Sequence, residues 1–146
     1  MSGKIIVGAL VLFTIIFGGF LWYAQFYAYY NEVNGLTSVE VEGRSVAVSD
    51  YVGLDGTSSG LKLRGCFTVD EADFDGVSLA DDPVPATPPN WFECFNAEEL
   101  THDVESGAAT TYMAAKDDMD GLDRLIAVYP DGRAFMWRQL NDKYQD

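Results

Sequence analysis

The sequence LDRLIAVYPDGRAFMWRQLN, residues 122–141, predicts the central pair of strands in this protein. Aliphatic and aromatic residues fill both halves, which favours strands. Between them, PDGR has the proline, aspartate and glycine of a tight turn. In the second half Phe135 and Trp137 share one face, while Met136 and Leu140 share the other. Apolar residues on both faces predict a central strand, or one that a helix covers.

Shorter runs rich in strand-forming residues extend this sheet. They occupy residues 36–43, 44–52, 61–69 and 108–115. Glu42 and Gly43 lie between the first two runs, at a position that suits a hairpin turn. A proline-rich loop, residues 81–90, follows the third run.

A single helix is expected after this loop. Asn96 is a good N-cap and Glu99 stands three residues on, as in a capping box. Leu100 and Val104 fall on one face, and Gly107 ends the helix. These elements predict an α+β fold, in which a small antiparallel sheet of about five or six strands has one helix packed across it.

The chain begins with an apolar segment that predicts a transmembrane helix. Residues 5–24 carry no charge, and a helix of that length spans about 30 Å, the thickness of a bilayer core. A cleaved secretory signal is the alternative, but its apolar region is shorter and ends at small residues. We therefore expect a retained N-terminal anchor, residues 1–30, followed by an extracytoplasmic domain, residues 31–146.

The flanking charges predict the orientation of this anchor. Lys4 precedes the span, and the charged residues between the span and Arg44 are all acidic. The N-terminus is therefore expected in the cytoplasm. Thr14, Gly18 and Gly19 are small residues on the span, where a partner helix of an integral membrane complex could approach closely.

The expected domain is strongly acidic. All 23 acidic residues and all but one of the nine basic ones follow residue 30, so its charge is −15, one unit below the chain's −14. Such a surface excludes nucleic acid binding, which needs basic groups. A partner-facing acidic surface is predicted at Asp70, Glu71, Asp73, Asp75, Asp81 and Asp82. It would attract a basic periplasmic protein such as a cytochrome c; solubility alone is the alternative explanation.

The two cysteines, Cys66 and Cys94, are expected to form a disulfide. An extracytoplasmic compartment is oxidising, and an even cysteine count favours pairing there. The bond would tie the proline-rich loop to a strand. Free buried thiols and a redox pair are the alternatives, although no C-x-x-C motif is present.

Two motifs have weaker chemical meaning. GTSSG around Ser58 matches a nucleophile elbow, but the single histidine, His102, is expected on the exposed side of the helix. DDMDG, residues 117–121, resembles part of a calcium loop, but its first and last ligand positions would be lysine and alanine. We predict no catalytic residue, metal or cofactor, and a weak surface cation site is the alternative at DDMDG.

The chain resembles an uncharacterised alphaproteobacterial family of small single-pass membrane proteins, sometimes mislabelled as histidine kinases. The resemblance rests on the anchor and on RGCFTV, NWFECF, GLDRLIAVYPDGR and MWRQLN. It implies a bacterial inner membrane and a domain that faces the periplasm. None of these motifs is catalytic.

The expected function is that of a non-enzymatic accessory or assembly subunit of a larger inner-membrane complex. A respiratory or photosynthetic electron-transfer complex is the specific expectation, by analogy. The alternative is a free-standing periplasmic binding module for a small ligand or cation. Its pocket would be lined by Trp91, Phe92, Phe95 and Trp137.

Overall fold

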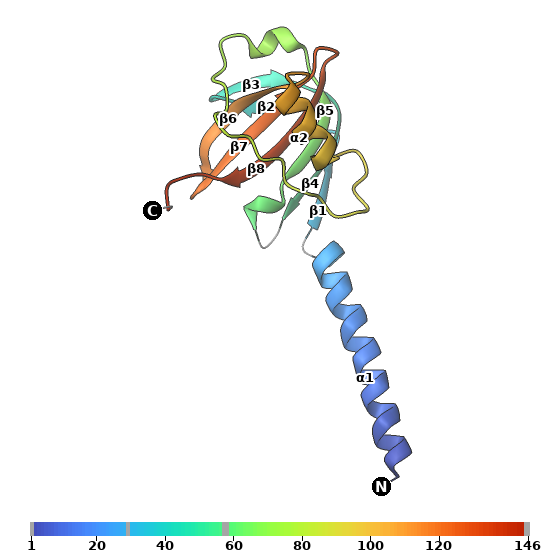
Figure 1. Cartoon of the computed structure of the whole chain (residues 1–146). Coiled ribbons are helices and arrows are strands. Elements are labelled where there is room, and N and C mark those ends of the chain that lie inside the picture. The colour runs from blue at the N-terminus through green and yellow to red at the C-terminus, as the bar shows by residue number, and fades with distance from the viewer. Residues whose placement is uncertain (1, 29, 57–58, 145–146) are drawn as a thin grey trace. The chain divides into compact units, whose positions relative to one another are not determined.

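A computed structural model describes residues 2–28, 30–56 and 59–144 of the chain (Figure 1). The chain divides into two compact units, Met1–Tyr30 and Asn31–Asp146. In the first unit, helix α1 (Gly3–Tyr23) continues as a π-helix, η1 (Ala24–Ala28). α1 is long and apolar enough to cross a membrane, and none of its residues is buried; a signal sequence has the same properties.

The second unit is built on a six-stranded sheet with the strand order β1-β4-β5-β8-β7-β6. In chain order these strands are β1 (Tyr30–Asn34), β4 (Ser49–Gly56), β5 (Arg64–Thr68), β6 (Thr110–Met119), β7 (Leu122–Val128) and β8 (Arg133–Leu140). A separate two-stranded sheet consists of β2 (Ser38–Val41) and β3 (Arg44–Ala47). Every strand pair whose register is described is antiparallel. The predicted α+β class is confirmed.

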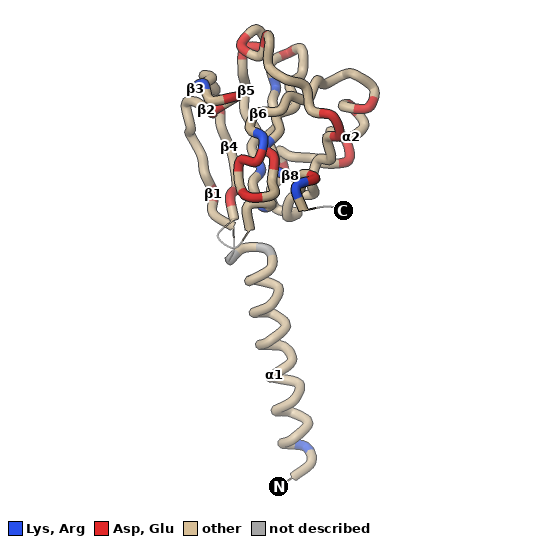
Figure 2. Tube along the Cα trace, turned by 90° about the vertical axis from the view of Figure 1, so that its left-hand side faces the viewer, with Lys and Arg blue, Asp and Glu red and all other residues tan. Residues whose placement is uncertain are grey.

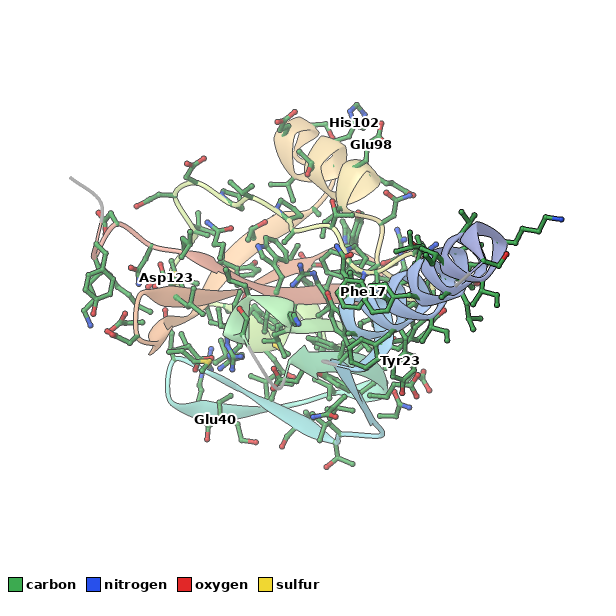
Figure 3. The ribbon with its side chains drawn as sticks, turned by 90° about the horizontal axis from the view of Figure 1, so that it is seen from below. Phe17, Tyr23, Glu40, Glu98, His102 and Asp123 are labelled. Atoms are coloured by element: carbon green, nitrogen blue, oxygen red, sulfur yellow. A yellow bond between two sulfur atoms is a disulfide. The ribbon has the colours of Figure 1, made fainter. Side chains whose placement is uncertain are left out.

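Helix α2 (Ala97–Ser106), the large sheet and the β2–β3 hairpin form three layers of this domain. Figure 3 shows Glu98 and His102 on the side of α2 that faces away from the sheet, and Glu40 on the outer side of β2. Two short 3₁₀ helices, η2 (Gly60–Lys62) and η3 (Glu71–Phe74), precede and follow β5. Both faces of the large sheet are therefore covered, and β8 is an interior strand, one of the two alternatives predicted from its apolar faces.

Each face of the sheet has its own core. On the hairpin side, Val41 and Val46 belong to one buried cluster with Ile126 and Met136 of the sheet. On the helix side, the Phe95 ring lies 6.2 Å from that of Trp137 and 5.9 Å from that of Phe135, in edge-to-face contacts. The alternation predicted for β8 is thus confirmed.

The hairpin of β7 and β8 has the predicted tight turn. The backbone N–H of Tyr129 donates to the carbonyl of Arg133 at 2.9 Å, and that of Gly132 donates to Tyr129 at 3.0 Å. Gly132 has a φ of 93°, and a Cβ there would lie 2.7 Å from the backbone oxygen of Val69. Only glycine fits this position without strain.

The predicted ends of α2 are also confirmed. The Asn96 side chain accepts a hydrogen bond from the backbone N–H of Glu99 at 3.1 Å, and Gly107 ends the helix with a φ of 86°. On the other side of the sheet, Glu42 and Gly43 form the β2–β3 turn with φ values of 50° and 79°. Positive φ at both positions is the geometry of a type I′ hairpin turn.

The strand predicted at residues 44–52 is wrong as a single element. The chain leaves β3 after Ala47, Val48 donates to the carbonyl of Thr37 at 3.0 Å, and β4 begins in the large sheet. A φ of 54° at Asp50 and a bulge between Ser49 and Val52 accompany this change of sheet. Strand β1 was not predicted, and β6 ends four residues beyond the predicted 108–115.

Candidate functional site

The predicted disulfide joins Cys66 of β5 to Cys94, two residues before the N-cap of α2. Their Cα atoms are 6.3 Å apart, within the usual range. No free cysteine remains among the described residues. The bond closes a loop of the chain that begins in the middle of the sheet, contains η3 and the proline-rich loop, and ends just before α2.

The six residues of the predicted acidic surface are all exposed, and they belong to two segments of the chain. Asp70, Glu71, Asp73 and Asp75 lie on and beside η3, where Asp70 caps that helix by accepting from Ala72 N–H at 3.1 Å. Asp81 and Asp82 lie further along the loop. Figure 2 shows the acidic residues spread over several parts of the domain. All six residues are thus accessible to a partner, and their role as one partner-facing surface stays a prediction.

The two glycines predicted to pack against a partner helix have open space beside them on α1. No atom from elsewhere lies within 4 Å of a Cβ built at Gly18 or Gly19. The Thr14 hydroxyl donates to the Leu10 carbonyl at 2.8 Å, within the helix. This face is available to a partner helix, and its role stays a prediction.

The candidate cation site does not assemble among the described residues. The GTSSG motif stays a sequence observation, because Ser58 lies outside the described residues; His102 is exposed on α2. Within residues 2–28, 30–56 and 59–144 no group of three or more His, Cys, Asp or Glu side chains could hold a metal ion. In the DDMDG segment the Lys143 ammonium donates to Asp117 at 3.1 Å and to Asp120 at 2.5 Å. A side-chain cation of the chain itself thus fills this acidic turn.

The segment 141–144 is attached to the β6–β7 hairpin by further contacts. The Asn141 N–H donates to the Gly121 carbonyl at 3.0 Å, and the Tyr144 hydroxyl donates to Asp120 at 2.6 Å. Hydrogen bonds from Gly121, Asn141 and Lys143 lower the pKa of Asp117, while Lys143 and Tyr144 lower that of Asp120. The same two carboxylates raise the pKa of Lys143.

A Lys143→Met variant is expected to lower the melting temperature near pH 7, by less than the changes argued in the Discussion. The lowered carboxyl pKa values contribute stability above the ordinary value of about 3.9, which is lost as the pH falls through the lower folded values. Melting curves of the full chain in detergent should therefore differ near pH 7 and converge near about pH 2. A difference that persists in acid would show that the lysine acts through packing.

The described residues of the domain form an open groove of about 950 Å³. The groove is lined by the segment 78–86, the middle of β6, the start of β7 and the end of β8, together with Glu42 and Leu61. Its volume lies at the upper end of the range for small-molecule sites, roughly 300–1,000 Å³. The proline-rich loop is therefore one wall of a hollow whose other wall is the sheet.

Backbone and side-chain hydrogen bonds hold this loop at a fixed place on the sheet. Ser78 accepts from the N–H of Met113 at 2.8 Å, and Ala80 donates to Thr111 at 3.0 Å, so the loop begins alongside β6. It then crosses to β8, where the Gln139 amide accepts from Val84 N–H at 2.7 Å and donates to the Asp82 carbonyl at 2.8 Å.

One carboxylate in the groove is almost fully buried. Asp123 of β7, labelled in Figure 3, is 8% exposed and lines the groove. Its Oδ1 accepts from the Asp117 N–H at 2.7 Å and from the Asn141 side chain at 3.0 Å. Among the described residues, no hydrogen-bond donor reaches its Oδ2.

The aromatic residues predicted to line a ligand pocket are mostly core residues. Phe92, Phe95 and Trp137 are 6%, 3% and 0% exposed. Trp91 and Phe92 border a separate hollow of about 200 Å³ beside Val52. The large groove, which contains none of these four residues, was not predicted. The sequence feature that could have indicated the groove is Asp123, an acidic residue in the mainly apolar segment 122–128.

These observations define a class of protein: a small α+β domain with an acidic and apolar groove, joined to a helix long enough to cross a membrane. The chain belongs to the family of unknown function DUF6446, which matches residues 34–146. No curated protein and no solved structure matches the chain.

Proposed function

We propose that this protein is a non-enzymatic, membrane-anchored accessory or assembly subunit of a larger bacterial inner-membrane complex. The groove carries this proposal, because its wall exposes apolar side chains on an otherwise acidic domain. Leu79, Leu140 and Val84 are 64%, 62% and 58% exposed, the highest values among aliphatic side chains in the described part of the domain, and all three line the groove. Apolar side chains gathered in this way typically mark an interaction site.

Two features support a periplasmic location for the domain. Lys4 before α1 favours a cytoplasmic N-terminus under the positive-inside rule. The Cys66–Cys94 disulfide supports the opposite side of the membrane for the domain, since disulfides persist in oxidising compartments.

The proposed complex would be contacted at two places. The Thr14, Gly18 and Gly19 face of α1 would pack against another membrane helix. The acidic domain would attract a basic periplasmic protein such as a cytochrome c, which makes a respiratory or photosynthetic electron-transfer complex our specific proposal, by analogy.

Co-purification of the tagged full chain from its native membrane tests this function. We expect detergent extracts to contain a defined set of integral membrane proteins, identified by mass spectrometry, in constant ratio to the tagged chain. A Gly18→Leu/Gly19→Leu variant distinguishes the contact made by α1 from the contact made by the domain, because it blocks close helix approach and leaves the domain intact. Recovery of the chain as a monomer without a membrane partner would exclude the proposal.

The alternative, a free-standing binding module for a small ligand or cation, is favoured by one observation. The groove has the volume of a small-molecule site and includes the carboxylate of Asp123, a residue that is 8% exposed. The experiment in the next subsection separates this alternative from a protein partner.

A further inference from the structure

The apolar part of the groove comes from two segments far apart in sequence. Leu79 and Val84 lie on the loop, and Leu140 is the last residue of β8. Because the hydrogen bonds of Gln139 and the strand-like pairing of residues 78–80 fix the loop, these side chains are held in position before any partner arrives. A preformed apolar surface favours binding because little ordering is needed.

Asp123 adds a specific polar requirement. A buried carboxylate is costly unless its oxygens are paired or hydrogen-bonded. Oδ1 is satisfied by Asp117 and Asn141, which also fixes the orientation of the side chain. Oδ2 accepts no hydrogen bond from the described residues and is not a buried atom, so a ligand N–H group would take the place of water there.

The charges of the lining favour a cationic ligand. Glu42, Asp81, Asp82, Asp123 and Asp142 contribute the negative charges. Lys116 and Arg138 are the basic lining residues, and Arg138 already donates to Asp118 at 2.9 Å. The groove is therefore acidic, and its least exposed acid is Asp123.

We propose that the groove binds an extended segment of a partner protein, in which a lysine or arginine side chain reaches Asp123 between apolar side chains that cover Leu79, Val84 and Leu140. A small amine or a hydrated cation would satisfy the carboxylate but leave the apolar side chains uncovered. Neighbouring residues of a peptide supply both chemistries at once. This inference rests on the proposed function, because the segment belongs to a subunit of that complex.

Peptide binding to the full chain in detergent tests the inference. The probes are capped peptides of about six residues, with a central lysine, arginine, glutamate or norleucine between leucine, valine or serine neighbours. We expect the basic peptides with apolar neighbours to bind at least about tenfold more tightly than those with glutamate or norleucine, measured by fluorescence anisotropy. Equal binding of all four central residues would overturn the inference.

Two variants with matched controls assign the site. Asp123→Asn keeps an oxygen for Asp117 but removes the charge, so the preference for lysine over norleucine should fall about tenfold. Glu98→Gln removes one charge from the outer side of α2 and should leave the preference unchanged. If Asp123→Asn unfolds, Leu140→Ser still tests the groove, and it should remove the preference for apolar neighbours. Leu36→Ser, at another exposed leucine, is its control.

A small amine provides the last arm of the test. If n-butylamine displaces the bound peptide at a concentration equal to the peptide's dissociation constant, the groove is a small-cation site and the inference is wrong. Selective peptide binding without any co-purified membrane protein would instead exclude the proposed membrane complex and support the peptide site. Co-purification without peptide selectivity would do the reverse, so the two proposals fail separately.

Discussion

Replacing Cys66 and Cys94 together by alanine is expected to lower the free energy of unfolding of the domain by about 3–4 kcal/mol. The disulfide closes a loop with a sequence separation of 28 residues, and cross-links of that span restrict the unfolded chain by about this amount. For a domain of this size the melting temperature should fall by roughly 10–20 °C. Denaturant unfolding followed by tryptophan fluorescence measures the change. On a Trp22→Phe background, both remaining tryptophans, Trp91 and Trp137, lie in the domain.

Reduction of the unmodified chain is the matched control for this variant. Dithiothreitol should destabilise the wild-type domain to the same extent and should have no effect on the double alanine variant. Unchanged stability in both experiments would favour a redox or free-thiol role for the cysteines. In that case their replacement would affect activity and leave the melting temperature unchanged.

The variant without Cys66 and Cys94 also tests whether the attachment of the loop affects peptide binding in the groove. The closed loop carries Asp81, Asp82 and Val84, which line the groove, and the disulfide fixes the end of that loop at the sheet. Peptide affinity should therefore decrease in the double alanine variant at temperatures where the domain remains folded. The proline-rich loop has little regular structure, so its attachments decide its position.

The regular part of the fold could be predicted because its signals are local. The PDGR turn, the Glu42-Gly43 turn and the Asn96 cap each depend on residues within a few positions of one another. The disulfide was also predictable, because the expected compartment and the even cysteine count both favoured pairing. These features fix the sheet, the helix and the covered faces.

The change of sheet within residues 44–52 could not be predicted from the same signals. The residues of β3 and β4 share strand propensity, and their alternation breaks only at Ser49 and Asp50, so their separation depends on tertiary contacts of Val48 and on the bulge between Ser49 and Val52. β1 lacks an apolar alternation and is formed by pairing at the edge of the sheet.

The groove was missed for a different reason. It brings together Glu42, the segment 78–86, Asp123 and the end of β8, which are distant in sequence, and no spacing rule relates them. The predicted acidic surface contained two of its residues, Asp81 and Asp82, but sequence could not separate them from the η3 cluster. The DDMDG turn likewise could be assigned to Lys143 only after the path of the last residues was known.

Arg64 is the second position where we expect a large effect, although the sequence gives no reason to single it out. It is 5% exposed on β5, and its guanidinium donates to four backbone carbonyls. Nη1 contacts Leu61 and Leu63, both at 2.6 Å, while Nε and Nη2 contact Ala86 and Thr87 at 2.8 and 3.3 Å. One side chain thus joins η2 and the proline-rich loop to the sheet.

Arg64→Met should lower the free energy of unfolding by roughly 2–4 kcal/mol, because it leaves partly buried carbonyls without their charged donor. Arg64→Lys should recover part of this loss, since an ammonium keeps the charge but cannot reach both segments as the planar guanidinium does. Arg133→Met, at an exposed arginine in the β7–β8 turn, is the matched control and should change stability little. All three are measured by denaturant unfolding. Equal effects at positions 64 and 133 would mean that the loop is held without Arg64, by its hydrogen bonds to β6 and Gln139 and by the disulfide.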